Sequence, residues 1–225
     1  MAPTLEALLE PARLQPAARA RLAIYGTLVL EANRRFNLTG AKSPQELAAH
    51  LLDSLTVLPF VREPYVDVGA GAGLPSIPIA IVAEIPVTMV ESVAKKARFL
   101  NEAVERLGLR AQVIAQRAET AAHLPALRER FASGTVRAVA SAPTVAELLL
   151  PFITAGGIAI FQRGGLPPHE RRALEDAVLM LGGFIEGEHE LQASGKRILI
   201  VRKANATPAR FPRRSGVPQK RPLCV

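Results

Sequence analysis

The sequence contains a single cysteine, Cys224, and no tryptophan among its 225 residues. One cysteine excludes an internal disulfide and a cysteine-based zinc site, and such sparing use of cysteine is typical of a reducing cytoplasm. No run of about 18 uninterrupted apolar residues occurs, so no membrane-spanning segment is predicted. Residues 1–11 hold acids and prolines instead of the basic and then apolar pattern of a secretion signal. We therefore expect a cytoplasmic protein that does not bind membranes.

Acidic residues are absent from the C-terminal 24 residues, so the positive charge of the protein is concentrated there. The protein carries 28 Lys and Arg against 20 Asp and Glu, a net charge of +8. Residues 202–225 contain no acid and seven basic residues, namely Arg202, Lys203, Arg210, Arg213, Arg214, Lys220 and Arg221. A basic segment beside a nearly neutral remainder predicts either a polyanionic partner, nucleic acid above all, or a solvated tail that only aids solubility.

Residues 1–62 have the pattern of a helical extension. Apolar residues spaced for one side of a helix predict a first long helix over residues 17–33. The run from Ser43 to Glu46 has a capping-box pattern with proline at the first helical position. It predicts a second helix that ends near Pro59.

Short apolar runs that predict strands alternate with amphipathic helices from residue 65 onward. The predicted strands are residues 65–68, 87–91, 111–115, 136–140, 158–162, 184–191 and 197–202. Strands that alternate with helices indicate a parallel sheet wound with crossover helices. The last two strands are joined by a turn at residues 193–195 and therefore pair antiparallel. The sequence thus predicts an α/β fold with a seven-stranded, mostly parallel sheet and a terminal antiparallel hairpin.

A glycine-rich turn follows the first predicted strand. Such a turn lets the backbone approach a ligand closely, and the amides of the next helix point at that ligand. Dinucleotide-binding enzymes use the spacing G-x-G-x-x-G, but Leu74 stands where the third glycine of that pattern belongs. The spacing here is G-x-G-x-G, at Gly69, Gly71 and Gly73, and Asp67 precedes it at the end of the strand.

Two carboxylates lie near this turn, and one of them, Asp67, distinguishes between the possible cofactors. Asp67 would repel a pyrophosphate, whereas the sulfonium and ammonium groups of S-adenosylmethionine favour a nearby carboxylate. Glu91 ends the second strand, where it can accept hydrogen bonds from ribose hydroxyls, a feature that fits both cofactors. The sequence therefore predicts a Rossmann-like class I methyltransferase domain over residues 63–203, which converts S-adenosylmethionine to S-adenosylhomocysteine. Residues 204–225 follow it as a basic C-terminal tail.

Several methyltransferase chemistries lack the residues that they need. Carbon methylation of RNA uses a cysteine nucleophile, and no internal cysteine exists. Methylation of exocyclic base amines goes with an Asn/Asp-Pro-Pro-aromatic run after the fourth strand, where this sequence reads Ser141-Ala-Pro143-Thr144. A guanine N7 loses no proton when it attacks a sulfonium methyl group, so positioning by the protein is enough to catalyse that transfer.

Further segments complete a pattern that extends over nearly the whole chain. They are residues 33–39, 50–55, 67–78, 91–100, 117–119, 137–140 and 211–218. The glycine turn alone is generic, but the Asn-Leu-Thr, His-x-x-Asp-Ser and Leu-Pro-x-Ile-Pro motifs together are specific. With these segments the chain resembles the bacterial ribosomal small-subunit methyltransferase G family, also called glucose-inhibited division protein B.

The resemblance implies methylation at N7 of a guanine in the 530 loop of 16S rRNA, with that RNA or the small ribosomal subunit as partner. The cofactor residues that follow from it and from the glycine turn are Asp67, Gly69, Gly71, Gly73, Leu74, Glu91, Ser92, Val93, Ala118, Glu119 and Arg137. In the family pattern Glu91 takes the ribose, and Ala118 and Glu119 hold the adenine. Arg137 is placed beside the methyl donor and is the catalytic candidate.

Three positions depart from the family pattern. Ser76 stands where a glycine is usual, and Ala132 replaces an acid expected before the fourth strand. Arg163 replaces a lysine, which keeps the charge but loses the compact ammonium group. None of these changes removes the predicted cofactor site.

The predicted RNA contacts are basic side chains, namely Lys95, Lys96, Arg163, Arg197, Arg213 and Arg214. The two lysines next to the glycine turn fit either a phosphate contact or a solvated helix face. If the C-terminal tail binds rRNA phosphates, removal of residues 207–225 should lower RNA affinity and flatten its salt dependence.

No metal site is predicted, because His50 and Asp53 share one helix face but lack the third ligand that zinc requires. We expect a monomer. Two other functions stay open at this point. One is a non-catalytic RNA-binding module that kept a methyltransferase fold, and it would not bind S-adenosylmethionine. The other is a small-molecule methyltransferase, which would leave the basic tail without a purpose.

Overall fold

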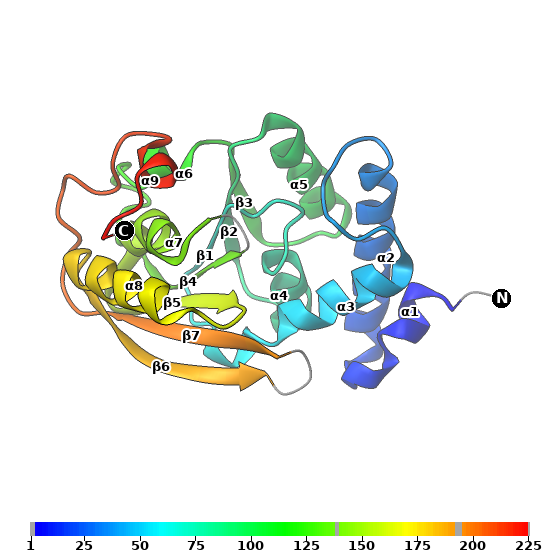
Figure 1. The fold of residues 1–225 in the computed structure, drawn as a ribbon. Coiled ribbons are helices and arrows are strands. Elements are labelled where there is room, and N and C mark those ends of the chain that lie inside the picture. Colours follow the sequence, from blue (N-terminus) through cyan, green and yellow to red (C-terminus); the bar gives the residue numbers. More distant parts are fainter. Residues whose placement is uncertain (1–2, 138–139, 192–194, 225) are drawn as a thin grey trace.

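The computed structural model describes residues 3–137, 140–191 and 195–224, and a seven-stranded sheet forms its centre (Figure 1). The strands are β1 Tyr65–Val68, β2 Val87–Val90, β3 Ala111–Ile114, β4 Phe131–Arg137, β5 Ile153–Arg163, β6 Gly183–Leu191 and β7 Lys196–Lys203. Their order in the sheet is β3-β2-β1-β4-β5-β7-β6. The first five strands pair in parallel, and β7 is antiparallel to both of its neighbours. The predicted mostly parallel sheet with a terminal antiparallel hairpin is confirmed.

Helices cover both faces of the sheet. They are α1 Leu5–Leu8, α2 Pro16–Asn33, α3 Pro44–Leu55, α4 Ser76–Ala83, α5 Ala94–Arg106, α6 Ala118–Ala121, α7 Ala142–Leu149, α8 Pro168–Met180 and α9 Val217–Lys220. Short 3-10 turns lie at Glu10–Ala12, Leu58–Phe60 and Leu150–Phe152. Figure 1 shows α1, α2 and α3 at one side of the molecule and α6 to α9 at the other. Among the described residues, no helix combines the length and apolar character that crossing a membrane requires.

Two hydrophobic cores result, one on each face. In β5, Ile158 and Ile160 pack with α1 to α5, while Ala159 and Phe161 pack with α6, α7 and α8. This alternation is what a strand buried on both faces produces, since successive side chains point to opposite sides. The N-terminal helices thus share a core with the sheet.

The predicted capping box is present at the start of α3. Ser43 Oγ accepts a hydrogen bond from the backbone N–H of Glu46 at 3.2 Å. The Glu46 carboxylate accepts from the N–H of Lys42 at 2.7 Å, one residue before the cap. The helix ends at Leu55 and not near Pro59, because the chain around Pro59 forms the 3-10 turn Leu58–Phe60.

The fourth and fifth strands begin five residues earlier than the sequence predicts. β4 starts at Phe131, and its first five residues, Phe-Ala-Ser-Gly-Thr, lack the continuous apolar run by which a buried strand is recognised. Small residues are needed here, since a Cβ on Gly134 would lie within 3 Å of side chains of three neighbouring elements. Ala132 therefore lies inside β4, not before it. Residues 138–139 of the predicted strand, and 193–194 of the predicted hairpin turn, lie outside the described residues.

The C-terminal segment, residues 204–224, packs against the second core. Phe211 is buried there, and the Arg128 guanidinium donates to the carbonyl oxygens of Thr207 at 2.8 Å and Phe211 at 2.9 Å. Figure 1 shows the C-terminus beside α7 and α8. The segment is part of the folded body, so the predicted boundary at residue 204 does not release a free tail.

Candidate functional site

The loop after β1 lies at the carboxyl edge of the parallel strands, where such sheets bind ligands. Gly69, Gly71 and Gly73 have φ angles of 71°, 59° and 89°, a region that side chains with a Cβ rarely occupy. A Cβ on Gly73 would also come within 2.6 Å of Ile77. Glycine is therefore required at these three positions, and the exposed backbone of Gly69 is open to a ligand at the sheet edge.

The second strand holds this loop in place. The N–H groups of Gly69 and Ala70 donate to the carbonyl oxygen of Val90 at 2.8 and 3.1 Å. The Glu91 carboxylate accepts from the N–H of Gly71 at 2.8 Å and from that of Val93 at 2.7 Å. Each carboxylate oxygen of Glu91 keeps lone-pair capacity for a further donor, as the predicted ribose contact requires.

Asp67 lies beneath the loop and is almost completely buried. Its carboxylate accepts hydrogen bonds from Ser76 Oγ at 2.7 Å and from Thr135 Oγ1 at 2.9 Å. Burial raises the pKa of Asp67 to about 6, although these two hydrogen bonds and the charge of Arg137 act in the opposite direction. The departure at Ser76 thus supplies a hydrogen bond that glycine could not donate.

A pocket opens beside the loop, between the ends of β1, β2 and β4. Apolar side chains of Val68, Val90 and Val136 line one part of it. Of the predicted cofactor residues, it brings together Gly69, Ser92, Ala118 and Glu119. The apolar surface suits a nucleoside, and the Glu119 carboxylate and the backbone of Gly69 add polar groups to the same pocket.

The remaining predicted cofactor residues do not line this pocket, and Arg137 lines the neighbouring one. They are Asp67, Gly71, Gly73, Leu74, Glu91, Val93 and Arg137. The C-terminal segment, in contrast, contributes Pro218 and Gln219 to the wall. It also donates the N–H of Gly216 to the Glu119 carboxylate at 2.8 Å, a contact that the sequence did not indicate.

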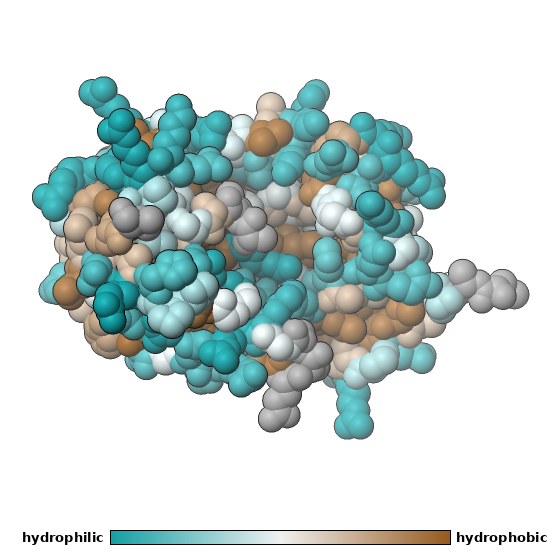
Figure 2. All heavy atoms as spheres, in the orientation of Figure 1, coloured by the Kyte–Doolittle hydropathy of each residue, from teal (hydrophilic) through white to brown (hydrophobic). Residues whose placement is uncertain are grey.

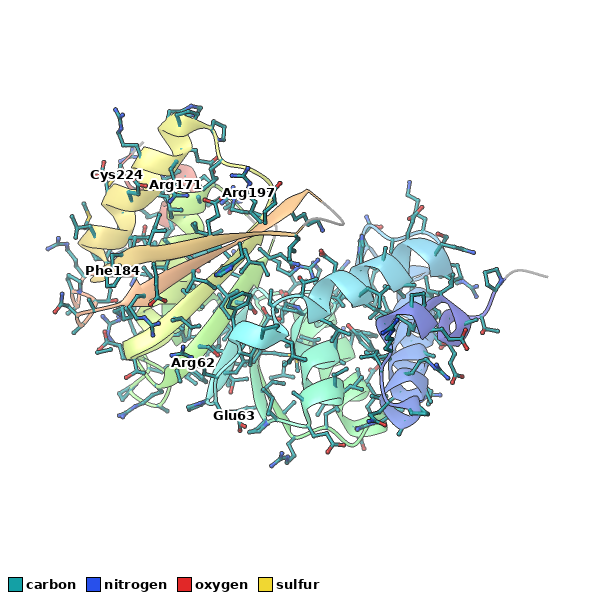
Figure 3. All side chains as sticks on the ribbon, turned by 90° about the horizontal axis from the view of Figure 1, so that it is seen from below. Arg62, Glu63, Arg171, Phe184, Arg197 and Cys224 are labelled. Carbon is teal, nitrogen blue, oxygen red and sulfur yellow. The ribbon has the colours of Figure 1, made fainter. Side chains whose placement is uncertain are left out.

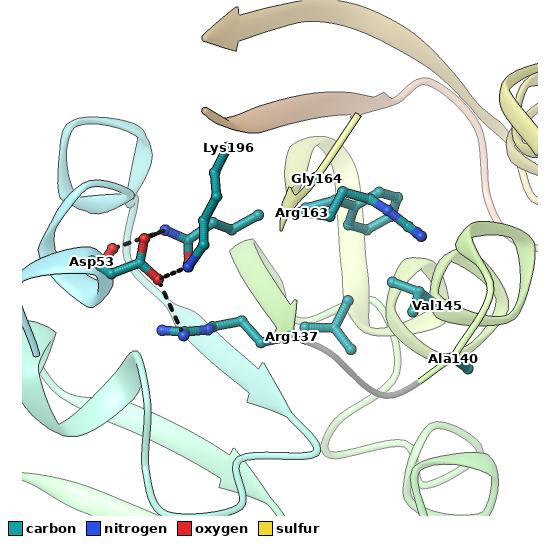
Figure 4. A pocket seen from close by; sticks show the side chains of 10 residues that line it. Asp53, Arg137, Ala140, Val145, Arg163, Gly164 and Lys196 are labelled. Carbon is teal, nitrogen blue, oxygen red and sulfur yellow. Dashed lines mark hydrogen bonds and ion pairs between the residues drawn. The ribbon is translucent and has the colours of Figure 1, made fainter. Parts of the chain in front are cut away.

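A second, basic pocket adjoins the first, and Val136 and Ala140 line both. Arg137, Arg163 and Lys196 bring positive charge to it. Figure 4 shows Arg137 and Lys196 converging on Asp53, while Arg163 points away from them. In Figure 2 this face is hollowed in the middle, between α3 and α7 as placed in Figure 1, with hydrophilic and hydrophobic side chains along the walls.

Asp53 is the centre of the polar contacts in the basic pocket. It pairs with Arg137 Nη2 at 3.2 Å and with Lys196 Nζ at 2.8 Å. Gln162 Nε2 donates to the backbone carbonyl of Asp53 at 2.8 Å, and Arg137 Nη1 donates to Ser54 Oγ at 2.9 Å. From the sequence we expect His50 and Asp53 to be a helix-packing or RNA-facing pair, and the His-x-x-Asp-Ser motif does not indicate the contacts of Asp53 with Arg137 and Lys196.

No metal centre is found among the residues that the structure describes, since none of them form a group of three or more suitable ligands. His50, the other half of the discarded metal pair, lies close to the same charges. Burial, and then the charges of Arg137 and Lys196, lower the pKa of His50.

The predicted RNA contacts do not gather into one patch. Arg163 and Arg197 are partners in the β5–β7 register, and each has an acid at 3.0 Å, Glu170 for Arg163 and Glu188 for Arg197. Figure 3 shows Arg197 near Arg171, which bonds the same Glu188.

The four other predicted RNA contacts have different surroundings. The Lys95 ammonium sits 5.3 Å from the ring centre of Phe36. Arg213 pairs at 2.6 Å with Glu147, whose side chain is completely buried. Arg214 is exposed, and Lys96 is half-buried. Arg213 is thus engaged in holding the C-terminal segment.

Comparisons of the sequence with a family model and with curated proteins point to the same family. The family model for rRNA small subunit methyltransferase G matches residues 18–199. A ribosomal RNA small subunit methyltransferase G from Rubrobacter xylanophilus is 39% identical, over 92% of this chain and 85% of its own. A protein of the same description from Deinococcus deserti is 40% identical, over 87% and 85% of the two chains.

Solved structures share the fold at low identity. The mitomycin 7-O-methyltransferase MmcR has a TM-score of 0.57 and 14% identity, over 90% of this chain and 76% of its own. The M. jannaschii TYW2 in complex with AdoMet has a TM-score of 0.52 and 14% identity, over 68% and 74% of the two chains. These likenesses establish a Rossmann-like methyltransferase fold.

Proposed function

The chain belongs to the rRNA small subunit methyltransferase G family, and from this we propose that it transfers a methyl group from S-adenosylmethionine to N7 of a guanine in the 530 loop of 16S rRNA. One observation carries the proposal. The pocket beside the glycine loop and the basic pocket share the wall formed by Val136 and Ala140. A donor in the first and an anionic acceptor in the second would therefore meet at the end of β4.

The residues present fit S-adenosylmethionine in the first pocket. Gly69 offers a backbone without a side chain, Ser92, Ala118 and Glu119 surround the space for the nucleoside, and Asp67 adds negative charge beneath. The cofactor, when bound, supplies a methyl group on a positively charged sulfonium, which makes that methyl electrophilic. The fold-related TYW2 structure holds AdoMet, which supports this choice of donor.

The basic pocket suits a nucleotide acceptor. Arg137 and Lys196 bring two positive charges, and Asp53 neutralises only part of them. Arginine and lysine at a groove wall are the side chains that bind nucleic acid phosphates. Arg163 faces the same space from β5 and adds a third cation, offset in part by Glu170.

Methylation at N7 requires no general acid or base from the protein. The lone pair of N7 forms the new bond to carbon while the carbon–sulfur bond breaks, and the guanine takes over the positive charge without losing a proton. The protein's part is to align donor and acceptor and to exclude water. Arg137 is the candidate for alignment, because Ser54 and Asp53 fix its guanidinium at the border of the two pockets.

The direct test incubates the protein with labelled S-adenosylmethionine and unmethylated small subunits or naked 16S rRNA, and then maps 7-methylguanosine. We expect label at one guanine of the 530 loop. No label in RNA in any assembly state would refute the proposal. Calorimetry with the cofactor alone separates an enzyme from a non-catalytic RNA-binding module, which would show no binding heat.

Arg137→Lys tests the alignment. The variant keeps the charge but loses the two-pronged contact with Ser54 and Asp53. We expect kcat/KM for RNA to fall by about tenfold to about a hundredfold, because small misplacements of reacting groups are costly. An unchanged kcat/KM would remove Arg137 from the proposed machinery.

A further inference from the structure

Tyr25, in the middle of α2, contacts the glycine loop from outside the sheet. Its side chain is completely buried, and its hydroxyl donates a hydrogen bond to the carbonyl oxygen of Ala72 at 2.6 Å. A carbonyl oxygen only accepts, so the hydroxyl must keep its proton. Burial, and then the charge of Asp67, raise the pKa of Tyr25 far above its usual value, which keeps the hydroxyl a donor.

The same loop is held a second time from the sheet side. The Glu91 carboxylate accepts from the N–H of Gly71 at 2.8 Å. Ala72 follows Gly71 directly, so two peptide groups close together in the loop are fixed by side chains from two different elements. One anchor belongs to β2 and its following turn, and the other belongs to a helix 47 residues earlier in the chain.

The loop needs such anchors because its own backbone does not select one conformation. Gly71 and Gly73 have φ angles of 59° and 89°, and glycine adopts positive and negative φ with similar ease. When only a fraction of molecules has a binding-competent site, the observed Kd rises by the inverse of that fraction. A hydrogen bond that favours the competent loop therefore acts on ligand affinity, even without touching the ligand.

We propose that Tyr25 is a positioning residue for the cofactor site, holding the loop from Gly69 to Gly73 in the conformation that binds S-adenosylmethionine. The inference rests on the proposed function and deepens it. It makes α2, and with it the N-terminal helical region, part of the cofactor site.

The test compares Tyr25→Phe with the wild-type full-length protein. The variant keeps the ring in the core and removes only the hydroxyl. We expect the Kd for S-adenosylmethionine, measured by calorimetry, to rise by about threefold to about tenfold, the usual worth of one such hydrogen bond. The KM for the cofactor should rise similarly, whereas kcat at saturating cofactor should stay within about twofold of wild type, because the occupied site has the same geometry.

Ser133→Ala is the matched control. Ser133 is also completely buried, and its hydroxyl also donates to a backbone carbonyl, that of Arg62, at 2.5 Å. This contact joins β4 to the chain before β1 and does not involve the glycine loop. Both variants should unfold at lower urea concentration than wild type, but only Tyr25→Phe should bind the cofactor more weakly.

Hydrogen exchange in the cofactor-free protein gives a second, independent readout. The amides of residues 69–73 should exchange faster in Tyr25→Phe than in Ser133→Ala. Equal Kd values and equal exchange in Tyr25→Phe and wild type would overturn the proposal, and so would equally weakened binding in both variants. A wild-type protein that binds no S-adenosylmethionine would instead overturn the proposed function, and the exchange data would still decide whether Tyr25 holds the loop.

Discussion

Asp67 is a buried acid whose ionisation is set by a few neighbours. Burial raises its pKa to about 6, and the hydroxyls of Ser76 and Thr135 stabilise the charged form against that effect. Arg137 lowers the pKa further through its charge, while Tyr25 and Tyr65 lie near enough for the charge of Asp67 to raise their own pKa values. The charge of Asp67 beneath the glycine loop is therefore titratable close to neutral pH.

This titration predicts how cofactor affinity depends on pH. Below its pKa, Asp67 is protonated and no longer attracts a cation. A cationic cofactor binds the ionised form better, so its affinity should be highest above pH 6 and fall as the pH drops through about 6. We expect a loss of about tenfold between about pH 8 and about pH 5, which corresponds to about 1.4 kcal/mol. Calorimetry with S-adenosylmethionine across this range measures it.

Two variants identify the group responsible. Asp67→Asn should bind more weakly at high pH and show a nearly flat profile, apart from any dependence left by His50. Ser76→Ala removes a donor to the carboxylate, so the pKa of Asp67 should rise and the midpoint should move to higher pH. A midpoint that is the same in Ser76→Ala and wild type would contradict this assignment.

Basic residues of the C-terminal segment differ in their surroundings: one is paired with a buried acid, and its neighbour is exposed to solvent. Arg213 pairs with the completely buried Glu147, and Arg221 adds its carbonyl oxygen as a second acceptor. Arg214, the next residue after Arg213, is exposed. Removal of residues 207–225 would therefore uncover the part of the second core against which Phe211 packs and leave Glu147 without its partner, besides removing basic charge. Single substitutions separate these effects.

Arg213→Ala and Arg214→Ala form a matched pair of neighbouring charge deletions. Loss of Arg213 leaves a buried carboxylate unpaired, so the free energy of unfolding should fall by about 3–5 kcal/mol. Loss of Arg214 should change it by no more than about 0.5 kcal/mol. If Arg214 contacts one phosphate, the slope of log affinity against log salt should drop by about 0.7–0.9 in that variant. Urea unfolding and RNA binding at several salt concentrations measure both effects.

Equal stability of the two variants would show that the pair of Arg213 with Glu147 does not hold the segment. An unchanged salt slope in Arg214→Ala would remove Arg214 from the RNA-binding residues. The two outcomes are independent, because one concerns folding and the other concerns association.

At the scale of the whole molecule, the N-terminal helices and the sheet share one core. Leu22 and Val29 of α2, and Leu47 and Leu51 of α3, lie in the same buried cluster as Met89 of β2. A region with this much common apolar surface cannot unfold separately without exposing the face of the sheet that it covers. The region that the sequence presents as an extension is therefore integral to the fold.

This shared core predicts a single cooperative unfolding transition. Scanning calorimetry of the full chain should give equal calorimetric and van't Hoff enthalpies. A fragment of residues 63–225 should fail to fold, because the face under α2 and α3 would be exposed to water. Two separate transitions, or a stably folded fragment, would show that the two parts are independent.

Local patterns allowed much of the fold to be predicted from the sequence. The glycine loop, the capping box at Ser43 and the strand–helix alternation each depend on residues a few positions apart, and the rules for crossover connections then fix a mostly parallel sheet. The early starts of β4 and β5 escaped prediction. In β4 the residues from Ala132 to Thr135 are small or polar, and the close approach of α7, β5 and β1 at Gly134 requires a small residue there, so no apolar periodicity marks the strand.

The sequence by itself determined the loop, its glycines and the acids Asp67 and Glu91, because steric and charge requirements act there within one short segment. Only the tertiary structure decided which distant residues support them. Tyr25 bonds Ala72 across 47 residues, and Arg137 bonds Asp53 across 84. Such contacts leave no periodic signal, since their partners are chosen by the packing of whole elements around the sheet. The residue types of the candidate site thus follow from one short segment of sequence, whereas the contacts that hold the site rigid depend on the packing of the shared core.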